Sequence, residues 1–295
     1  MPGHLVKVKK KMSIYAKRRV KTVLSGNYGS VFKGRGMDFD DLRPYMYGDD
    51  VKDIDWKASA RSRAPMIRRY IAIRKHNIMI LADSGLGMAA LAPSGERKSD
   101  LGTFAAGVIA YIASKNGDLV GMTFGNNAGN SRFALKEGAN HIENFLDKYS
   151  KAVSLESSES NINNLLTYVS KNFRERMFLI VITDVHGAAS VSEDLLRRLR
   201  VRHEQMFILV QDSMLTNQKF KDTEVRDVTA NLRLPRFIRR NKKLSQAEAD
   251  LRQNSETKVQ HDLRRLGICS CILNDTETAI PSIFKMLEEQ KHVRR

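Results

Sequence analysis

The sequence is poor in residues that restrain a chain covalently or conformationally. Its only cysteines are Cys269 and Cys271, and its 295 residues include six prolines. Thiols at i and i+2 of an expected strand share a face but are too close for an easy disulfide, and two thiols alone do not form a zinc site. We therefore expect two reduced core thiols in a globular chain without long disordered tracts.

Long hydrophobic runs are also missing, although hydrophobic residues make up 42% of the chain. No apolar run approaches the roughly 20 residues that a membrane-spanning helix needs. The first residues lack the hydrophobic stretch of a signal peptide. We expect a cytoplasmic protein without a transmembrane segment.

Acidic residues are absent from two segments of this chain, whose net charge is +17. Residues 1–36 carry ten Lys or Arg and residues 61–76 carry six, whereas residues 37–60 carry seven Asp against three bases. A basic arm at 1–36 could bind nucleic acid or an anionic membrane surface, but we favour a solvated, partly mobile arm. Aromatic residues are only 7% and fall mostly in apolar runs, so no base-stacking platform is visible.

Motifs for nucleotide binding and for hydrolytic catalysis are incomplete or missing. Gly26, Gly29 and Gly34 fall almost where a protein kinase has its glycine-rich loop, but Leu24 replaces the first glycine. The kinase lysine, catalytic-loop and metal-binding motifs are absent, as are the P-loop, the His-Glu-x-x-His motif and the Gly-x-Ser-x-Gly elbow. We expect no ATP binding or hydrolysis and no enzymatic activity.

Short apolar runs recur from residue 78 onward and alternate with helical patterns. The runs are 78–82, 119–124, 177–182, 206–210 and 268–273, and the helical spacings cover 101–112, 162–173 and 192–200. Such runs are typical of strands buried on both faces. The alternation predicts a doubly wound α/β domain with a mainly parallel, Rossmann-like sheet. Residues 66–74 alternate in polarity, and we expect them to pair antiparallel with 78–82.

Acidic residues follow several of these strands at the edge where such folds bind ligands. Asp83, Asp184 and Asp212 come at or soon after strand ends. Carboxylates on neighbouring strand ends could hold a hard cation or could cap the following helices. The spacing alone favours capping.

The segment 34–70 resembles the signature of the bacterial DUF58 family (domain of unknown function 58). The matching positions are Gly34, Gly36, Phe39, Leu42, Arg43, Tyr45, Gly48, Asp49, Asp50, Ile54, Asp55, Trp56, Ala60 and Arg61. The resemblance implies a von Willebrand factor A-like core, which agrees with the predicted fold. We divide the chain into a basic, glycine-rich arm (1–36), the signature segment (37–65) packed on the core, and the α/β domain (66–295).

The signature segment also has a physical interpretation. Gly48 permits a sharp turn, and Asp50 with Asp53 has capping-box spacing. We expect a structural brace anchored by a buried Trp56, with Asp55 pairing to Arg61.

The resemblance further implies a Mg²⁺ site of the Asp-x-Ser-x-Ser type. Here Gly85 and Gly87 stand where that motif has serines, which leaves Asp83, Ser160 and Asp184 as a degenerate set. Since Mg²⁺ needs near-ideal oxygen ligands, we expect no cofactor, with Mg²⁺ as a weak alternative.

The family's association with AAA+ ATPases of the MoxR type implies a protein partner. We expect a non-enzymatic adaptor or assembly factor that docks through the carboxyl-end rim of its sheet, where glycines leave backbone groups open. The rim residues are Asp83, Ser84, Gly85, Gly87, Ser160, Asp184 and His186. The alternatives are a basic protein that binds nucleic acid or an anionic membrane through residues 1–36, and a metal-dependent hydrolase at Asp83 and Asp184.

Overall fold

The chain forms two compact units in a computed structural model that describes residues 3–18, 37–72, 75–216, 224–230, 233, 235 and 241–293. The larger unit comprises Met1–Val31 and Asn77–Arg295, and the smaller unit comprises Phe32–His76. This division differs from the boundaries expected at residues 36 and 65. The glycines at 34 and 36 lie outside the described residues.

The larger unit is built on a six-stranded sheet in the order β5-β4-β3-β6-β7-β8. The strands are β3 (Asn77–Asp83), β4 (Leu119–Asn126), β5 (Gly129–Lys136), β6 (Phe178–Asp184), β7 (Glu204–Val210) and β8 (Cys269–Leu273). All neighbours pair in parallel except β5, which returns antiparallel along β4. The predicted apolar runs are therefore the parallel strands, and the doubly wound, mainly parallel α/β fold class is confirmed.

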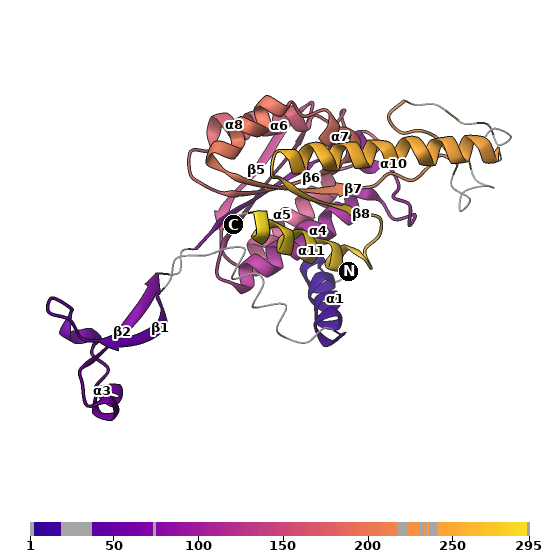
Figure 1. Cartoon of the computed structure of the whole chain (residues 1–295). Coiled ribbons are helices and arrows are strands. Elements are labelled where there is room, and N and C mark those ends of the chain that lie inside the picture. Colours follow the sequence, from indigo (N-terminus) through magenta and orange to yellow (C-terminus); the bar gives the residue numbers. More distant parts are fainter. Residues whose placement is uncertain are drawn as a thin grey trace. The chain divides into compact units, whose positions relative to one another are not determined.

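Helices cover both faces of this sheet, as Figure 1 shows. The helices on one face are α1 (His4–Arg18), α4 (Lys98–Lys115), α5 (Ala139–Ala152) and α11 (Ala279–Val293). On the other face lie α6 (Ile162–Asn172), α7 (Val185–Ala189), α8 (Glu193–Arg202) and α10 (Lys242–Arg265), and a short 3₁₀ turn, η2 (Leu86–Ala89), follows β3. Alternate residues of the central strands face each layer, which explains why these strands are apolar throughout. Within the described part of the chain, no helix has both the length and the apolarity to cross a bilayer.

The first described residues form a packed helix, so the expectation of a solvated arm is wrong over α1. Leu5, Val8 and Met12 are buried at helical spacing. The carboxylate of Glu143 accepts hydrogen bonds from the N–H groups of His4 and Leu5 at 2.6 and 2.8 Å, and so satisfies two donors that a helix start leaves open. The basic residues fill the outer face of an amphipathic helix that is part of the core.

We predict that Met12→Ala lowers the free energy of unfolding by about 2–5 kcal/mol, because it removes a buried side chain. The matched control is Ile14→Ala on the same helix, where 46% of the side chain is exposed, and this change should stay within about 0.5 kcal/mol. Denaturant titration of the full chain measures both values. Equal effects would show that α1 is not packed on the core.

The smaller unit is a β-hairpin with two short helical segments. Strand β1 (Met37–Pro44) pairs antiparallel with β2 (Met66–Ala72), and between them lie η1 (Val51–Asp53) and α3 (Trp56–Ser62). The expected pairing of residues 66–74 with β3 is therefore wrong, because β3 pairs with β4 on one side and with β6 on the other.

Acidic side chains organise the loop of this hairpin. The Asp55 side chain accepts from the N–H groups of Lys57 and Ala58 and caps α3, and Asp50 caps η1 through Lys52 N. The carboxylate of Asp49 forms a two-pronged ion pair with Arg43.

Trp56 does not anchor this unit. It begins α3 with 68% of its surface exposed, so the expectation of a buried tryptophan is wrong. The capping aspartate at position 55 fixes the start of the helix without help from the indole.

Accordingly, we predict that Trp56→Ala changes the free energy of unfolding by no more than about 0.5 kcal/mol. By contrast, Ile67→Ala should destabilise by about 2–5 kcal/mol, since Ile67 is only 4% exposed. Chemical denaturation of both variants tests the contrast, and a large loss for Trp56→Ala would contradict the exposed placement.

Candidate functional site

The carboxyl ends of the parallel strands bring three acidic side chains to one edge of the sheet. Asp83 ends β3, Asp184 ends β6, and Asp212 follows β7 by two residues. Asp83 and Asp184 are buried. The sequence prediction of neighbouring carboxylates at this edge is therefore consistent with their placement.

Asp83 is held by the backbone and hydroxyls around it. Its Oδ1 accepts from Gly85 N at 2.8 Å, and its Oδ2 accepts from Thr183 Oγ1 at 3.2 Å. Burial, followed by the negative charge of Asp184, raises the pKa of Asp83, although the Gly85 N–H and the Ser160 and Thr183 hydroxyls act in the opposite direction. The carboxyl group thus binds a proton more readily than a solvent-exposed aspartate does.

A buried lysine completes the cluster. Lys98, the first residue of α4, is fully buried, and its Nζ donates to Asp184 Oδ2 at 2.8 Å and also to Asp212 Oδ1. Burial by itself lowers the pKa of the Lys98 ammonium, but the charges of Asp184 and Asp212 outweigh it, so the pKa is raised. The side chain is therefore a fixed cation.

The two partners of Lys98 respond differently. Burial opposes ionisation of Asp184, but the ammonium and the Gly187 N–H, 2.6 Å from Asp184 Oδ1, lower the pKa of this carboxyl. Burial dominates at Asp212 and raises its pKa despite the ammonium. Through Gly187, Asp184 also caps α7, which agrees with the capping function favoured from the sequence.

The residues at the rim fit a Mg²⁺ ion poorly. Gly85 and Gly87 supply no hydroxyl, and Lys98 already occupies an oxygen of Asp184. A Cβ on Gly87 would lie 3.1 Å from Asp184 Oδ2 and 3.3 Å from Ser160 Oγ, so a serine there would crowd both groups. The Ser160 hydroxyl is buried without a hydrogen bond of standard geometry. No cluster of three or more His, Cys, Asp or Glu suited to a metal occurs among the described residues.

Much of the predicted docking rim is closed to a partner. Asp83, Ser84 and Asp184 are buried. The backbone of Gly85 is engaged as well, because its N–H bonds to Asp83, its carbonyl accepts from Met88 N, and any Cβ would collide with Ser160. The expectation that Gly85 leaves open backbone groups is wrong.

The accessible part of the rim lies around those residues. His186 is exposed at the start of α7, and the loop 154–159 carries Leu155 with 71% of its surface exposed. This loop is tied to the rim by hydrogen bonds from Leu86 N to Ser158 O and from Asn127 N to Glu159 O.

Sequence reasoning missed Lys98, although a local signal was present. Arg97 and Lys98 stand at the start of a helix, where the macrodipole disfavours cations. The first turn offers a single acidic residue, Asp100. A cation in that position needs a tertiary partner to offset the dipole.

A family model and known proteins match this chain in sequence. The family model described as "Protein of unknown function DUF58" matches residues 41–234, more than half of the chain. The chain belongs to the DUF58 family. It is 25% identical over 218 residues to uncharacterized proteins of Mycobacterium bovis and Mycobacterium tuberculosis, in a match that covers 74% of this chain and 66% of each relative.

Solved structures resemble the DUF58 chain only distantly. An aerotolerance-related membrane protein from Bacteroides fragilis aligns with a TM-score of 0.42 and 10% identity over 72% of this chain and 99% of that one. A von Willebrand factor type A protein from Catenulispora acidiphila aligns with a TM-score of 0.41 and 8% identity over 77% of this chain and 45% of that one.

Removal of the buried ammonium provides a test of the rim. We predict that Lys98→Met lowers the free energy of unfolding by about 3–5 kcal/mol at neutral pH, because two carboxylates lose their cation. The matched control is Lys151→Met, which breaks an exposed pair with Asp147 and should cost at most about 1 kcal/mol.

The deficit of Lys98→Met should shrink as the pH falls from about 7 to about 5. Without the ammonium, the folded-state pKa of Asp184 rises above its unfolded value, and the pKa of Asp212, which is already raised, rises further. Groups with raised folded pKa values stabilise the fold at low pH and lose this contribution as the pH rises. Urea unfolding across this range measures the trend, and a deficit independent of pH would contradict it.

Proposed function

We propose that this chain is a non-enzymatic, cytoplasmic protein-interaction module that binds an AAA+ ATPase of the MoxR type. The partner follows from the association of the DUF58 family with such ATPases. The observation that carries the proposal is the Lys98 cluster, which makes the rim of the sheet a rigid surface with its own internal cation.

The chemistry of the rim favours docking over catalysis. A catalytic acid or base must reach its substrate, but Asp83 and Asp184 are buried and bound to neighbouring groups. We propose that Lys98 supplies the positive charge that a metal ion supplies in von Willebrand factor A-like sites. On this proposal, neither folding nor partner binding needs Mg²⁺.

The contacts proposed for the partner are exposed side chains, namely a leucine, a histidine and two aromatic residues. Leu155 and His186 border the rim of the larger unit. In the smaller unit, Tyr47 and Trp56 are exposed aromatics that make no large contribution to packing there. Aromatic residues are enriched among the residues that dominate binding energy, so we assign these two to partner contact as well.

A pull-down of the MoxR-type ATPase by the purified full chain tests the proposal. We predict capture by wild type and a loss of at least about tenfold in affinity for Leu155→Asp combined with His186→Glu, because the rim contacts lose apolar area and gain repulsive charge. Trp56→Ala should weaken capture without changing stability. EDTA should leave capture unchanged.

The matched control is Leu251→Asp on α10, where the leucine is 69% exposed, and this variant should bind as wild type does. If wild type captures no ATPase, the adaptor proposal fails. If the double variant at Leu155 and His186 still binds normally, the rim assignment is wrong. Loss of binding in that variant, with normal binding by Leu251→Asp, supports the rim assignment.

A further inference from the structure

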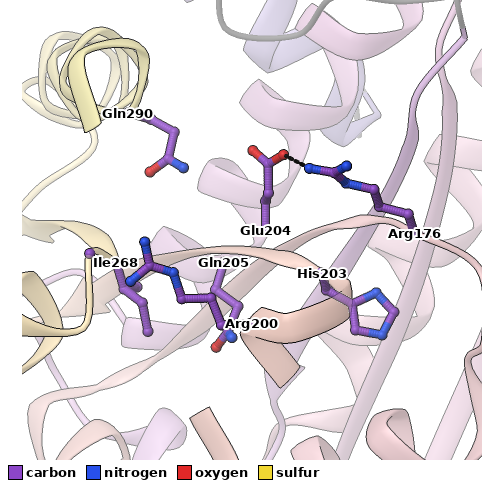
Figure 2. A pocket seen from close by; sticks show the side chains of 8 residues that line it. Arg176, Arg200, His203, Glu204, Gln205, Ile268 and Gln290 are labelled. Carbon is purple, nitrogen blue, oxygen red and sulfur yellow. Dashed lines mark hydrogen bonds and ion pairs between the residues drawn. The ribbon is translucent and has the colours of Figure 1, made fainter. Parts of the chain in front are cut away.

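A polar cavity lies at the edge of the sheet opposite the Lys98 cluster. It measures about 280 Å³ and is lined by Arg176, Arg200, His203, Glu204, Gln205, Gly267, Ile268 and Gln290. These residues lie just before β6, β7 and β8, at the start of β7, or on α8 and α11, so the cavity opens at the amino ends of the strands. Figure 2 shows Gln290, Glu204 and Arg200 extending from different elements into a common space.

Three buried side chains in this cavity carry polar atoms that have no partner within the described part of the chain. The atoms are Gln205 Oε1, Gln290 Oε1 and His203 Nδ1, and their residues are 2%, 4% and 2% exposed. Gln205 Nε2 donates to Leu196 O at 2.8 Å, which fixes the orientation of that amide and leaves its oxygen as the open acceptor. Unsatisfied buried polar atoms are rare, and several in one cavity indicate a missing hydrogen-bonding partner.

A cation is available beside these acceptors. The side chain of Arg200, an exposed residue of α8, forms no hydrogen bond or ion pair with any residue that the structure describes, and its guanidinium lies against Gly267. Gly267 has a φ of 65°, and a Cβ there would collide with the guanidinium. The glycine therefore keeps open the position that Arg200 occupies.

The remaining charges in the cavity cancel. Arg176 Nη2 donates to Glu204 Oε1 at 3.0 Å. Burial, followed by the positive charge of Arg202, lowers the pKa of His203 despite its hydrogen bond to the Phe173 backbone, and so favours the neutral imidazole. The cavity thus has a surplus of one positive charge, on Arg200.

We propose that this cavity binds a small carboxylic acid that also carries N–H or O–H donors, as an amino acid or a hydroxy acid does. The carboxylate pairs with the Arg200 guanidinium, whose planar donors suit it. The N–H or O–H groups donate to Gln205 Oε1 and Gln290 Oε1. A fully deprotonated phosphate or a simple carboxylate satisfies the arginine but leaves the two amide oxygens without donors.

The volume limits the size of the ligand. A cavity of about 280 Å³ is slightly smaller than the typical range for drug-sized ligands, which begins at about 300 Å³, so it takes an acid of amino-acid size. Ile268 supplies an apolar wall for the carbon skeleton. Ordered water is the competing occupant, because it also satisfies polar cavities.

Ligand-observed NMR and thermal denaturation of the full chain separate these occupants. The probes are L-glutamine, L-lactate, butyrate, which has no donor, and ethanolamine, which has no carboxylate. We expect L-glutamine or L-lactate to bind with a millimolar Kd and to raise the melting temperature, and butyrate and ethanolamine to bind at least about tenfold more weakly. The stronger of the first two identifies an amino acid or a hydroxy acid as the ligand type.

Variants assign the binding to this cavity. Arg200→Gln and Gln290→Leu should each weaken the tighter probe by at least about tenfold. The matched control is Arg198→Gln on α8, which removes an exposed guanidinium bonded to Asp194 O and should change nothing. Gln290→Leu should also keep or raise the melting temperature of the ligand-free chain, because it removes an unsatisfied buried oxygen.

Each alternative outcome overturns the proposal. Failure of both L-glutamine and L-lactate to bind would leave water as the occupant. Butyrate binding as tightly as they do would show that the amide oxygens select nothing. Equal losses in the Arg198 and Arg200 variants would place binding outside the cavity, and a lower melting temperature of Gln290→Leu with binding retained would show that its amide is already satisfied.

Discussion

The buried ammonium of Lys98 joins three segments that are far apart in sequence. It starts α4, and its two partners follow β6 and β7, so one side chain fixes a helix to adjacent strand ends. Removal of an ammonium and carboxylates from water is expensive, and the cluster persists because its charges and hydrogen bonds compensate one another. Burial raises the pKa values of Asp83 and Asp212, so these carboxyl groups bind a proton more readily and the negative charge of the cluster is smaller. The order of the rim depends on this balance.

The two edges of the sheet consequently have opposite characters. At the carboxyl ends, Asp83, Asp184 and Lys98 are buried and bonded to neighbouring groups, which makes this edge a stiff support for the loops around it. At the amino ends, two amide oxygens and the Arg200 guanidinium have no hydrogen-bonding partner among the described residues. The buried charges at one edge of the sheet are therefore paired within the protein, whereas the opposite edge leaves two buried amide oxygens open.

The sequence predicted the parallel strands because each is a short apolar run, and the strand ends then placed Asp83 and Asp184 correctly. Helix α1 was missed because its lysines concealed the apolar spacing of Leu5, Val8 and Met12. Strand β5 was missed because it is almost entirely exposed and polar. Trp56 was misjudged because a large apolar side chain suggests burial, whereas the Asp55 cap is sufficient to start its helix. The cavity left no local pattern, since its polar atoms come from four separate elements.

The polar edge strand β5 has a consequence for the pairing of further strands with the sheet. Exposed main-chain groups at a sheet edge are a template on which other chains add strands. Along β5 the side chains are mostly exposed and include Arg132 and Lys136, and the opposite edge, β8, spans only Cys269–Leu273. Charged or very short edge strands discourage such pairing. Both edges of the sheet therefore disfavour extension of the backbone ladder by a strand from another chain.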